Sequence, residues 1–201
     1  MQKEGTMPYG ILLCGLNGSG KSTLNHALAK AVGYAELDAE DYYFPNQKKA
    51  RLAALKADEN VEIQQEAEIP FTNPVSKAEV ERSLLADIGI TPKFILSCVK
   101  ADWTPKILSQ VAVVFHIITP PDVRAERIVS REVRRFGSRV LPGGDMYEGQ
   151  VQFRRFAAGR DETVVTDSFA GLYCPIITLD GMLPAAENVQ KIREILAEIA
   201  G

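Results

Sequence analysis

The feature that most constrains this chain is a glycine-rich stretch near its start that ends in lysine and serine. Residues 15–22 have the spacing G-x-x-x-x-G-K-S; a short apolar run precedes them at 11–14, and a helical pattern follows at 24–32. In a strand–loop–helix of this kind, successive backbone N–H groups point at phosphates and the helix N-terminus adds partial positive charge. The sequence therefore predicts a loop that binds the phosphates of a nucleoside triphosphate.

The loop supplies the first set of candidate binding residues. Lys21 is expected to reach the β- and γ-phosphates, and the Ser22 hydroxyl is a candidate ligand for Mg²⁺. The residues expected to bind the nucleotide are Gly15, Asn17, Gly18, Ser19, Gly20, Lys21, Ser22 and Thr23.

Length and composition limit the class of protein. The chain has 201 residues and a net charge of −3, which disfavours a general nucleic-acid binder. It contains no apolar run near the roughly 20 residues of a membrane span, no signal-peptide pattern at its start and no C-x-x-C pair among its cysteines. We expect a single cytoplasmic domain over residues 1–201, a monomer or homodimer, with reduced thiols, no nucleic-acid partner and no membrane association.

Strand-like segments alternate with helical patterns along the chain. Ser76 and Glu79 form a capping box for a helix over 77–87, a polar stretch holds a predicted helix over 48–57, and a closing helix is expected over 185–199. This alternation predicts an α/β fold, a P-loop NTPase fold with a parallel five-stranded sheet and helices on both faces. The expected strands are 11–14, 34–38, 93–99, 111–118 and 175–179.

Two carboxylates follow the second expected strand. In open α/β sheets, ligands bind at the carboxyl ends of strands, so Asp38 is expected to face the phosphate loop. Asp38 is a candidate for the Mg²⁺ shell, and both Asp38 and Asp41 are candidates to accept a proton from an attacking hydroxyl. The alternative is that both aspartates only cap a following helix or turn.

Arginine is concentrated in one part of the chain, because nine of the twelve arginines fall within residues 124–160. Arg124, Arg127, Arg131 and Arg135 share one face of the helix expected after 120–122. Such a face is either a solvated surface or, because guanidinium groups bind phosphate oxygens in pairs, part of a phosphate site.

The phosphate loop and the segment 38–44 together resemble the small P-loop kinases. Uridine and nicotinamide-riboside kinases have an Asp-Asp-aromatic-aromatic stretch after the second strand, although Ala39 and Glu40 separate the aspartates here. Residues 96–102 resemble gluconate kinases, and the layout of nearly the whole chain is similar to shikimate and nucleoside monophosphate kinases. Residues 73–76 and 143–147 are similar to uncharacterised bacterial ATP-binding proteins that carry a kinase label.

This resemblance implies an ATP-dependent phosphotransferase that uses Mg²⁺. It implies an acceptor-binding region at about 42–75 and an arginine-rich lid at about 120–160. On the lid, Arg127 is expected to pack near the adenine, while Arg131 and Arg135 neutralise the transferring phosphate. The expected acceptor is the hydroxyl group of a small molecule, a nucleoside or a sugar-like compound.

Two other functions stay open. A nucleoside monophosphate kinase needs arginines for its acceptor phosphate, and residues 46–75 contain only Arg51. A regulatory P-loop ATPase without a small-molecule acceptor commonly has an aspartate at the end of the third strand. Asp102 lies near that position, and an ordinary surface turn is an equal interpretation of it.

Overall fold

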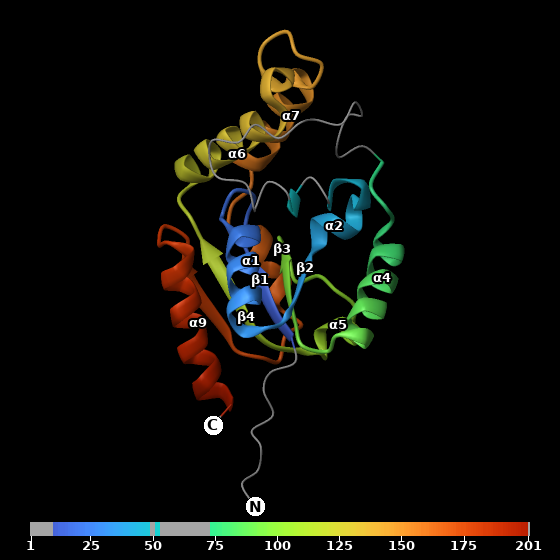
Figure 1. Ribbon diagram of the computed structural model, residues 1–201, viewed down its shortest axis with the longest axis vertical. Helices are drawn as coiled ribbons and strands as arrows, with labels where there is room; N and C mark the ends of the chain where they lie inside the picture. Colours follow the sequence, from blue (N-terminus) through green and yellow to red (C-terminus); the bar gives the residue numbers. More distant parts are fainter. Residues whose placement is uncertain (1–9, 49–50, 53–72, 201) are drawn as a thin grey trace, which may run out of the picture.

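The structure is a computed structural model, and it describes residues 10–48, 51–52 and 73–200. Within these residues, five parallel strands form one sheet in the order β2-β3-β1-β4-β5 (Figure 1). The strands are β1 (Gly10–Cys14), β2 (Ala35–Asp38), β3 (Phe94–Cys98), β4 (Val111–Ile118) and β5 (Ile176–Asp180). The predicted α/β fold with a parallel five-stranded sheet is confirmed.

Helices cover both faces of the sheet, as predicted (Figure 1). Buried side chains of α1 and α9 pack on one face, and those of α4, α5 and α8 pack on the other. The α-helices are α1 (Lys21–Val32), α2 (Ala39–Tyr43), α4 (Lys77–Ile90), α5 (Pro105–Leu108), α6 (Pro121–Phe136), α7 (Tyr147–Ala158), α8 (Thr163–Thr166) and α9 (Ala185–Ala200). The short 3₁₀ helices are η1 (Pro45–Gln47), η2 (Gly137–Val140) and η3 (Asp167–Phe169).

The central strand shows how the sequence builds two core layers. Leu12 and Cys14 of β1 belong to the layer under α4 and α5, whereas Ile11 and Leu13 belong to the layer under α1 and α9. All four side chains are fully buried. A strand that is covered on both faces needs an unbroken apolar run, which is why the sequence in β1 does not alternate between apolar and polar residues.

The element boundaries differ from the predicted ones by a few residues. Helix α4 continues to Ile90 rather than ending at 87, and the Ser76 side chain caps its start by accepting from the Glu79 N–H. Most of the predicted helix over 48–57, and most of the expected acceptor-binding region at about 42–75, lie outside the described residues.

Helices α6 and α7 stand together beyond the carboxyl ends of the strands, within the region of about 120–160 that we call the lid (Figure 1). Phe136, Val140 and Met146 form a small apolar core at its tip. One turn before the end of α6, the buried Glu132 carboxylate lies 3.6 Å from the Arg154 guanidinium of α7. The lid is therefore a helical pair with contacts of its own.

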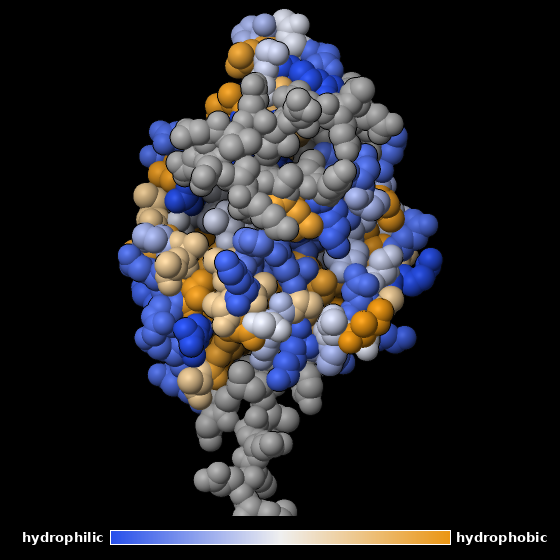
Figure 2. Space-filling model, in the orientation of Figure 1, coloured by the Kyte–Doolittle hydropathy of each residue, from blue (hydrophilic) through white to orange (hydrophobic). Residues whose placement is uncertain are grey.

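The surface in Figure 2 is mostly hydrophilic where it is described, with apolar residues in small separate areas. No helix in the described part of the chain is long and apolar enough to cross a membrane.

Candidate functional site

The predicted phosphate loop joins β1 to α1 at the centre of the sheet. Gly18 and Gly20 have φ values of 81° and 94°, in the left-handed region that glycine adopts without strain. A Cβ atom on Gly18 would also stand 2.5 Å from the carbonyl oxygen of Arg124, so the start of α6 packs directly behind the loop. The glycines are needed for both the curvature of the loop and this close approach.

Lys21, the first residue of α1, lies over the loop. Its Nζ donates to the Leu16 carbonyl oxygen at 2.9 Å and lies 3.5 Å from the Ser19 Oγ. Burial lowers the pKa of Lys21 to about 8; the nearby Asp38 carboxylate opposes this shift, and the charge of Arg131 adds to it. A lysine in this state gains strongly from an anion placed beside it.

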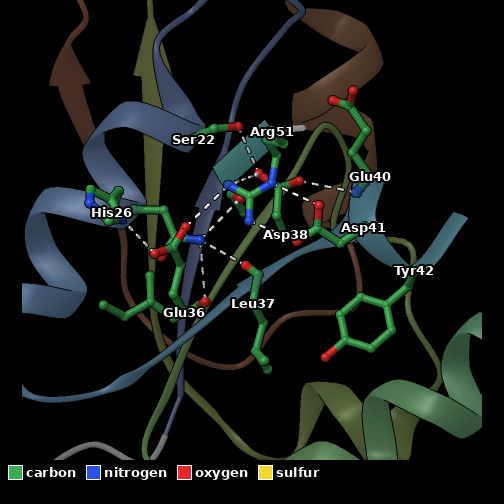
Figure 3. A network of polar contacts seen from close by, with 12 residues as sticks. Ser22, His26, Glu36, Leu37, Asp38, Glu40, Asp41, Tyr42 and Arg51 are labelled. Atoms are coloured by element: carbon green, nitrogen blue, oxygen red, sulfur yellow. Dashed lines mark hydrogen bonds and ion pairs between the residues drawn. The ribbon is translucent and has the colours of Figure 1, made fainter. Parts of the chain in front are cut away.

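Ser22 and Asp38 connect the phosphate loop to the end of β2. The Ser22 hydroxyl donates to Asp38 Oδ2 at 2.7 Å, and the Glu40 N–H donates to Asp38 Oδ1 at 3.0 Å (Figure 3). Asp38 therefore caps α2, as the alternative interpretation held, and also faces the loop. A serine hydroxyl and a carboxylate are hard oxygen ligands of the kind that Mg²⁺ prefers, so this pair fits the ion that the fold implies. Among the described residues, no group of three or more His, Cys, Asp or Glu side chains makes a metal site of another kind.

Asp41 has a different partner from Asp38. Arg51 donates through Nε and Nη2 to both oxygens of Asp41 at 2.7 Å, and through Nη1 to Glu36 at 3.1 Å (Figure 3). The Arg51 and Asp41 side chains are 3% and 5% exposed, so water hardly screens this pair. Hydrogen bonds and charge from Asp41, together with the Asp38 charge, outweigh burial and raise the pKa of Arg51. Asp41 thus holds Arg51 in place.

The lid brings two of the predicted arginines over this acidic region. Arg135 Nη1 lies 3.9 Å from Glu40 Oε1, and burial, together with the charge of Arg131, lowers the pKa of Arg135 to about 10. Arg131 also acts electrostatically on Lys21. Arg131 is therefore close enough to both Lys21 and Arg135 to influence each of them, an arrangement of like charges that favours a multiply charged anion beside it.

The other two arginines of the same helix face lie near the start of α6. Arg127 Nη1 donates to the carbonyl oxygen of Gly181, just after β5, at 3.0 Å and lies beside Gly20. Arg124 is buried and reaches the Asn17 carbonyl oxygen at 3.5 Å. Arginines of one helix face therefore lie in two different surroundings. Arg127 lies between the phosphate loop and the turn after β5, whereas Arg124 lies behind the loop.

Sequence reasoning did not assign some residues of this region. Arg160, which follows α7, donates to Asn17 Oδ1 at 3.2 Å. Arg51 was noted only as the single arginine of residues 46–75, with no role at the site. Four carboxylates in six residues, Glu36, Asp38, Glu40 and Asp41, were the available signal of a cation among them. Asp102 is half-exposed between Lys77 and Lys100, at 3.4 and 3.2 Å.

Both histidines have acidic partners. His26 lies 2.8 Å from Glu36, and the buried His116 of β4 lies 2.8 Å from Glu162 at the start of α8. Tyr42 donates to Asp87 at 2.6 Å, which ties α2 to α4.

Comparisons with known proteins agree with this fold. A gluconokinase from Sinorhizobium meliloti 1021 aligns with a TM-score of 0.51 and 17% identity over 96% of this chain and 94% of its own. A shikimate kinase from Acinetobacter baumannii, in complex with shikimate, aligns with a TM-score of 0.50 and 18% identity over 96% of this chain and 95% of its own. In sequence, the chain is 28% identical over 199 residues to the uncharacterized protein YqaC of Bacillus subtilis (strain 168), covering 95% of this chain and 99% of that protein. No family model matches the chain.

The chain therefore has the fold of the small P-loop kinases, as the resemblance in its sequence implied.

Proposed function

We propose that this protein is an ATP-dependent kinase that phosphorylates a hydroxyl group of a small molecule, a nucleoside or a sugar-like compound. The observation that carries the proposal is the 2.7 Å hydrogen bond between Ser22 and Asp38. It links the phosphate loop to a carboxylate at the carboxyl end of β2, where open α/β sheets bind their ligands. Lys21, Arg131 and Arg135 add positive charge to the same place.

In the proposed reaction, the acceptor oxygen forms a bond to the γ-phosphorus of ATP while the bond from that phosphorus to the bridging oxygen breaks, and ADP leaves. The acceptor hydroxyl gives its proton to a carboxylate, for which Asp38 is the better placed of the two aspartates because both oxygens of Asp41 accept from Arg51. Lys21, Arg131 and Arg135 neutralise charge on the phosphates.

Ser22 and Asp38 are the residues that would hold Mg²⁺, which supplies charge neutralisation at the β- and γ-phosphates when bound. Arg127 lies beside Gly20 and the turn after β5, which supports its predicted role near the adenine. The lid over about 120–160 is proposed to close on the nucleotide, and the region at about 42–75 to bind the acceptor.

The surroundings of Arg51 favour a hydroxyl acceptor over a phosphate acceptor. A nucleoside monophosphate kinase binds its acceptor phosphate with free cations, whereas Arg51 already donates to Asp41 and Glu36. Asp102 lies half-exposed between two lysines, an arrangement typical of a surface turn, and this gives a regulatory ATPase less support.

The test is a coupled assay of ADP formation with Mg²⁺-ATP and a panel of sugar acids, cyclitols, sugars and nucleosides. The panel starts with gluconate and shikimate, because two proteins with this fold are named for those compounds. We expect ADP formation that depends on one class of acceptor and that Lys21→Ala abolishes. ATP hydrolysis at the same rate with and without every acceptor would instead favour the regulatory ATPase.

A further inference from the structure

A cavity of about 400 Å³ lies beside the phosphate loop and has no part in the proposed reaction. It is bounded by the start of the loop, the N-terminal end of α6 and the connection from α7 to α8. Its apolar wall includes Leu16 and Ile118, and its charged lining consists of Arg124, Arg160, Asp161 and Glu162.

The cavity lies on the side of the phosphate loop where α6 begins. Arg124 contacts the Asn17 carbonyl oxygen, and its own backbone packs against Gly18. The Lys21 ammonium contacts a different carbonyl oxygen of the loop, that of Leu16. A ligand on Arg124 therefore faces other groups of the loop than a ligand on Lys21 does.

The two arginines of this cavity are not directly paired with its carboxylates. Arg124 is 4% exposed, its hydrogen bonds are long ones to the carbonyl oxygens of Asn17 and Arg160 at 3.5 and 3.4 Å, and its Nε has no partner. In the described part of the chain, neither guanidinium forms an ion pair. Burial and the neighbouring charge of Arg124 lower the pKa of Arg160. Two adjacent cations of this kind are costly unless an anion accompanies them.

The acidic residues of the cavity are already engaged. Glu162 lies 2.8 Å from the buried His116, and Asp161 accepts from the Thr163 N–H at 2.9 Å. Their remaining lone pairs can accept hydrogen bonds from hydroxyl groups. The lining therefore offers cations for an oxyanion and acceptors for neighbouring hydroxyls.

We propose that this cavity is a second ligand site, which binds a small hydroxylated compound through a phosphate or carboxylate group placed on Arg124 and Arg160. Such a ligand is distinct from ATP and from the acceptor of the proposed reaction. Because Arg160 also donates to Asn17 Oδ1, a bound anion competes for a contact with the phosphate loop and so couples the two sites.

The test measures binding by calorimetry, with glycerol phosphate and glycerate as the two probes. All proteins carry Lys21→Ala, which removes the main cation of the loop, so anion binding there contributes little. We expect one probe to bind with a 1:1 stoichiometry, and the one that binds distinguishes a phosphate site from a carboxylate site. Arg124→Met and Arg160→Met should each weaken that binding by about tenfold or more, the usual size of a lost charged hydrogen bond. Arg155→Met, which changes an exposed arginine of α7, is the matched control and should leave binding unchanged.

Loss of binding in the Arg155→Met control, equal affinity in all variants, or no binding of either probe would overturn the proposal. Arg124 packs against the loop, so the Arg124→Met variant can fail to fold. In that case Arg160→Met, a substitution at a half-buried position, decides the test. No step of this test uses ATP, so its outcome is independent of whether the protein proves to be a kinase.

Discussion

At the scale of single residues, the two carboxylates after β2 differ in how closely a cation holds them. Asp38 and Asp41 are three residues apart, and Arg51 lies 3.8 Å from Asp38 but donates two 2.7 Å hydrogen bonds to Asp41. Asp38 accepts from a hydroxyl and a backbone N–H, whereas Asp41 accepts two short hydrogen bonds from a buried guanidinium. Two aspartate side chains that lie three residues apart therefore have different surroundings.

The first prediction separates the two aspartates by substitution. Asp38→Asn should lower phosphoryl transfer by roughly 10²–10⁴-fold, the usual contribution of a general base, with little change in thermal stability. Asp41→Asn breaks a buried ion pair and should cost about 3 kcal/mol of unfolding free energy. Denaturant unfolding and steady-state kinetics on both variants check this. A stable Asp41→Asn protein with the larger loss of turnover would reverse the assignment.

The second prediction concerns the proton on Lys21. Its pKa of about 8 in the folded protein is below the ordinary 10.5, so the unfolded chain binds more protons between these values and stability rises with pH there. Below pH 8 the cost of burying the charged amine is fully present. Nucleotide phosphates favour the charged form, so binding of an ATP analogue at pH 8.5 should take up most of a proton. Calorimetry in two buffers of different ionisation enthalpy measures this uptake, and Lys21→Ala should abolish it.

The residues of the loop and Asp38 were predictable because short-range spacing determines where they lie. A phosphate loop is a local structure, and the end of a strand beside it is set by the order of elements. The partner of Asp41 was not predictable, because Arg51 reaches it only after the chain has folded back from α2. The division of one arginine face between Arg127 and Arg124 depends likewise on where α6 crosses the loop.

At the scale of elements, the neighbouring backbone at the tip of the lid leaves no room for a side chain at Gly144. A Cβ on Gly144 would stand 2.2 Å from the Arg139 carbonyl oxygen, and Met146 N–H donates to that same oxygen at 3.0 Å. The pair Gly143-Gly144 therefore closes a tight turn against η2. Periodicity in the sequence carries no information on such close contacts between backbones.

The third prediction tests this turn. Gly144→Ala should force the backbone apart at a cost of about 1–3 kcal/mol, typical of overpacking, and amide hydrogen exchange at Met146 should become faster. Gly149→Ala in α7 is the matched control, because nothing lies within 4 Å of its added Cβ and alanine favours a helix. Equal exchange at Met146 in the two variants would contradict the tight turn.

At the scale of the whole molecule, ligand binding should raise the free energy of unfolding and therefore the Tm. A nucleotide at about 100 times its Kd adds about 2.7 kcal/mol, which for a domain of this size raises Tm by about 5–10 °C. The fourth prediction is a shift of this size with a nonhydrolysable ATP analogue and Mg²⁺, reduced in EDTA because Ser22 and Asp38 then lack the ion. Melting curves at graded ligand concentrations measure it; an unchanged Tm for the wild-type protein would argue against nucleotide binding.

The fold class and all five strands followed from alternation and apolar runs. Burial on both faces leaves a strong apolar pattern in the inner strands, whereas β2 and β5 at the edges are only partly buried. The order of the strands in the sheet is a long-range property, and the pattern of residues along the chain did not indicate it.

The position of α9 has a consequence for the rate of folding. Ile192 and Leu196 of this helix cover the same apolar layer as Ile11 and Leu13 of β1, although the two elements are far apart in the sequence. Contacts between such distant residues require the closure of a long loop, and the entropy lost in that closure slows folding. We therefore expect this layer to form more slowly than a core built from neighbouring segments.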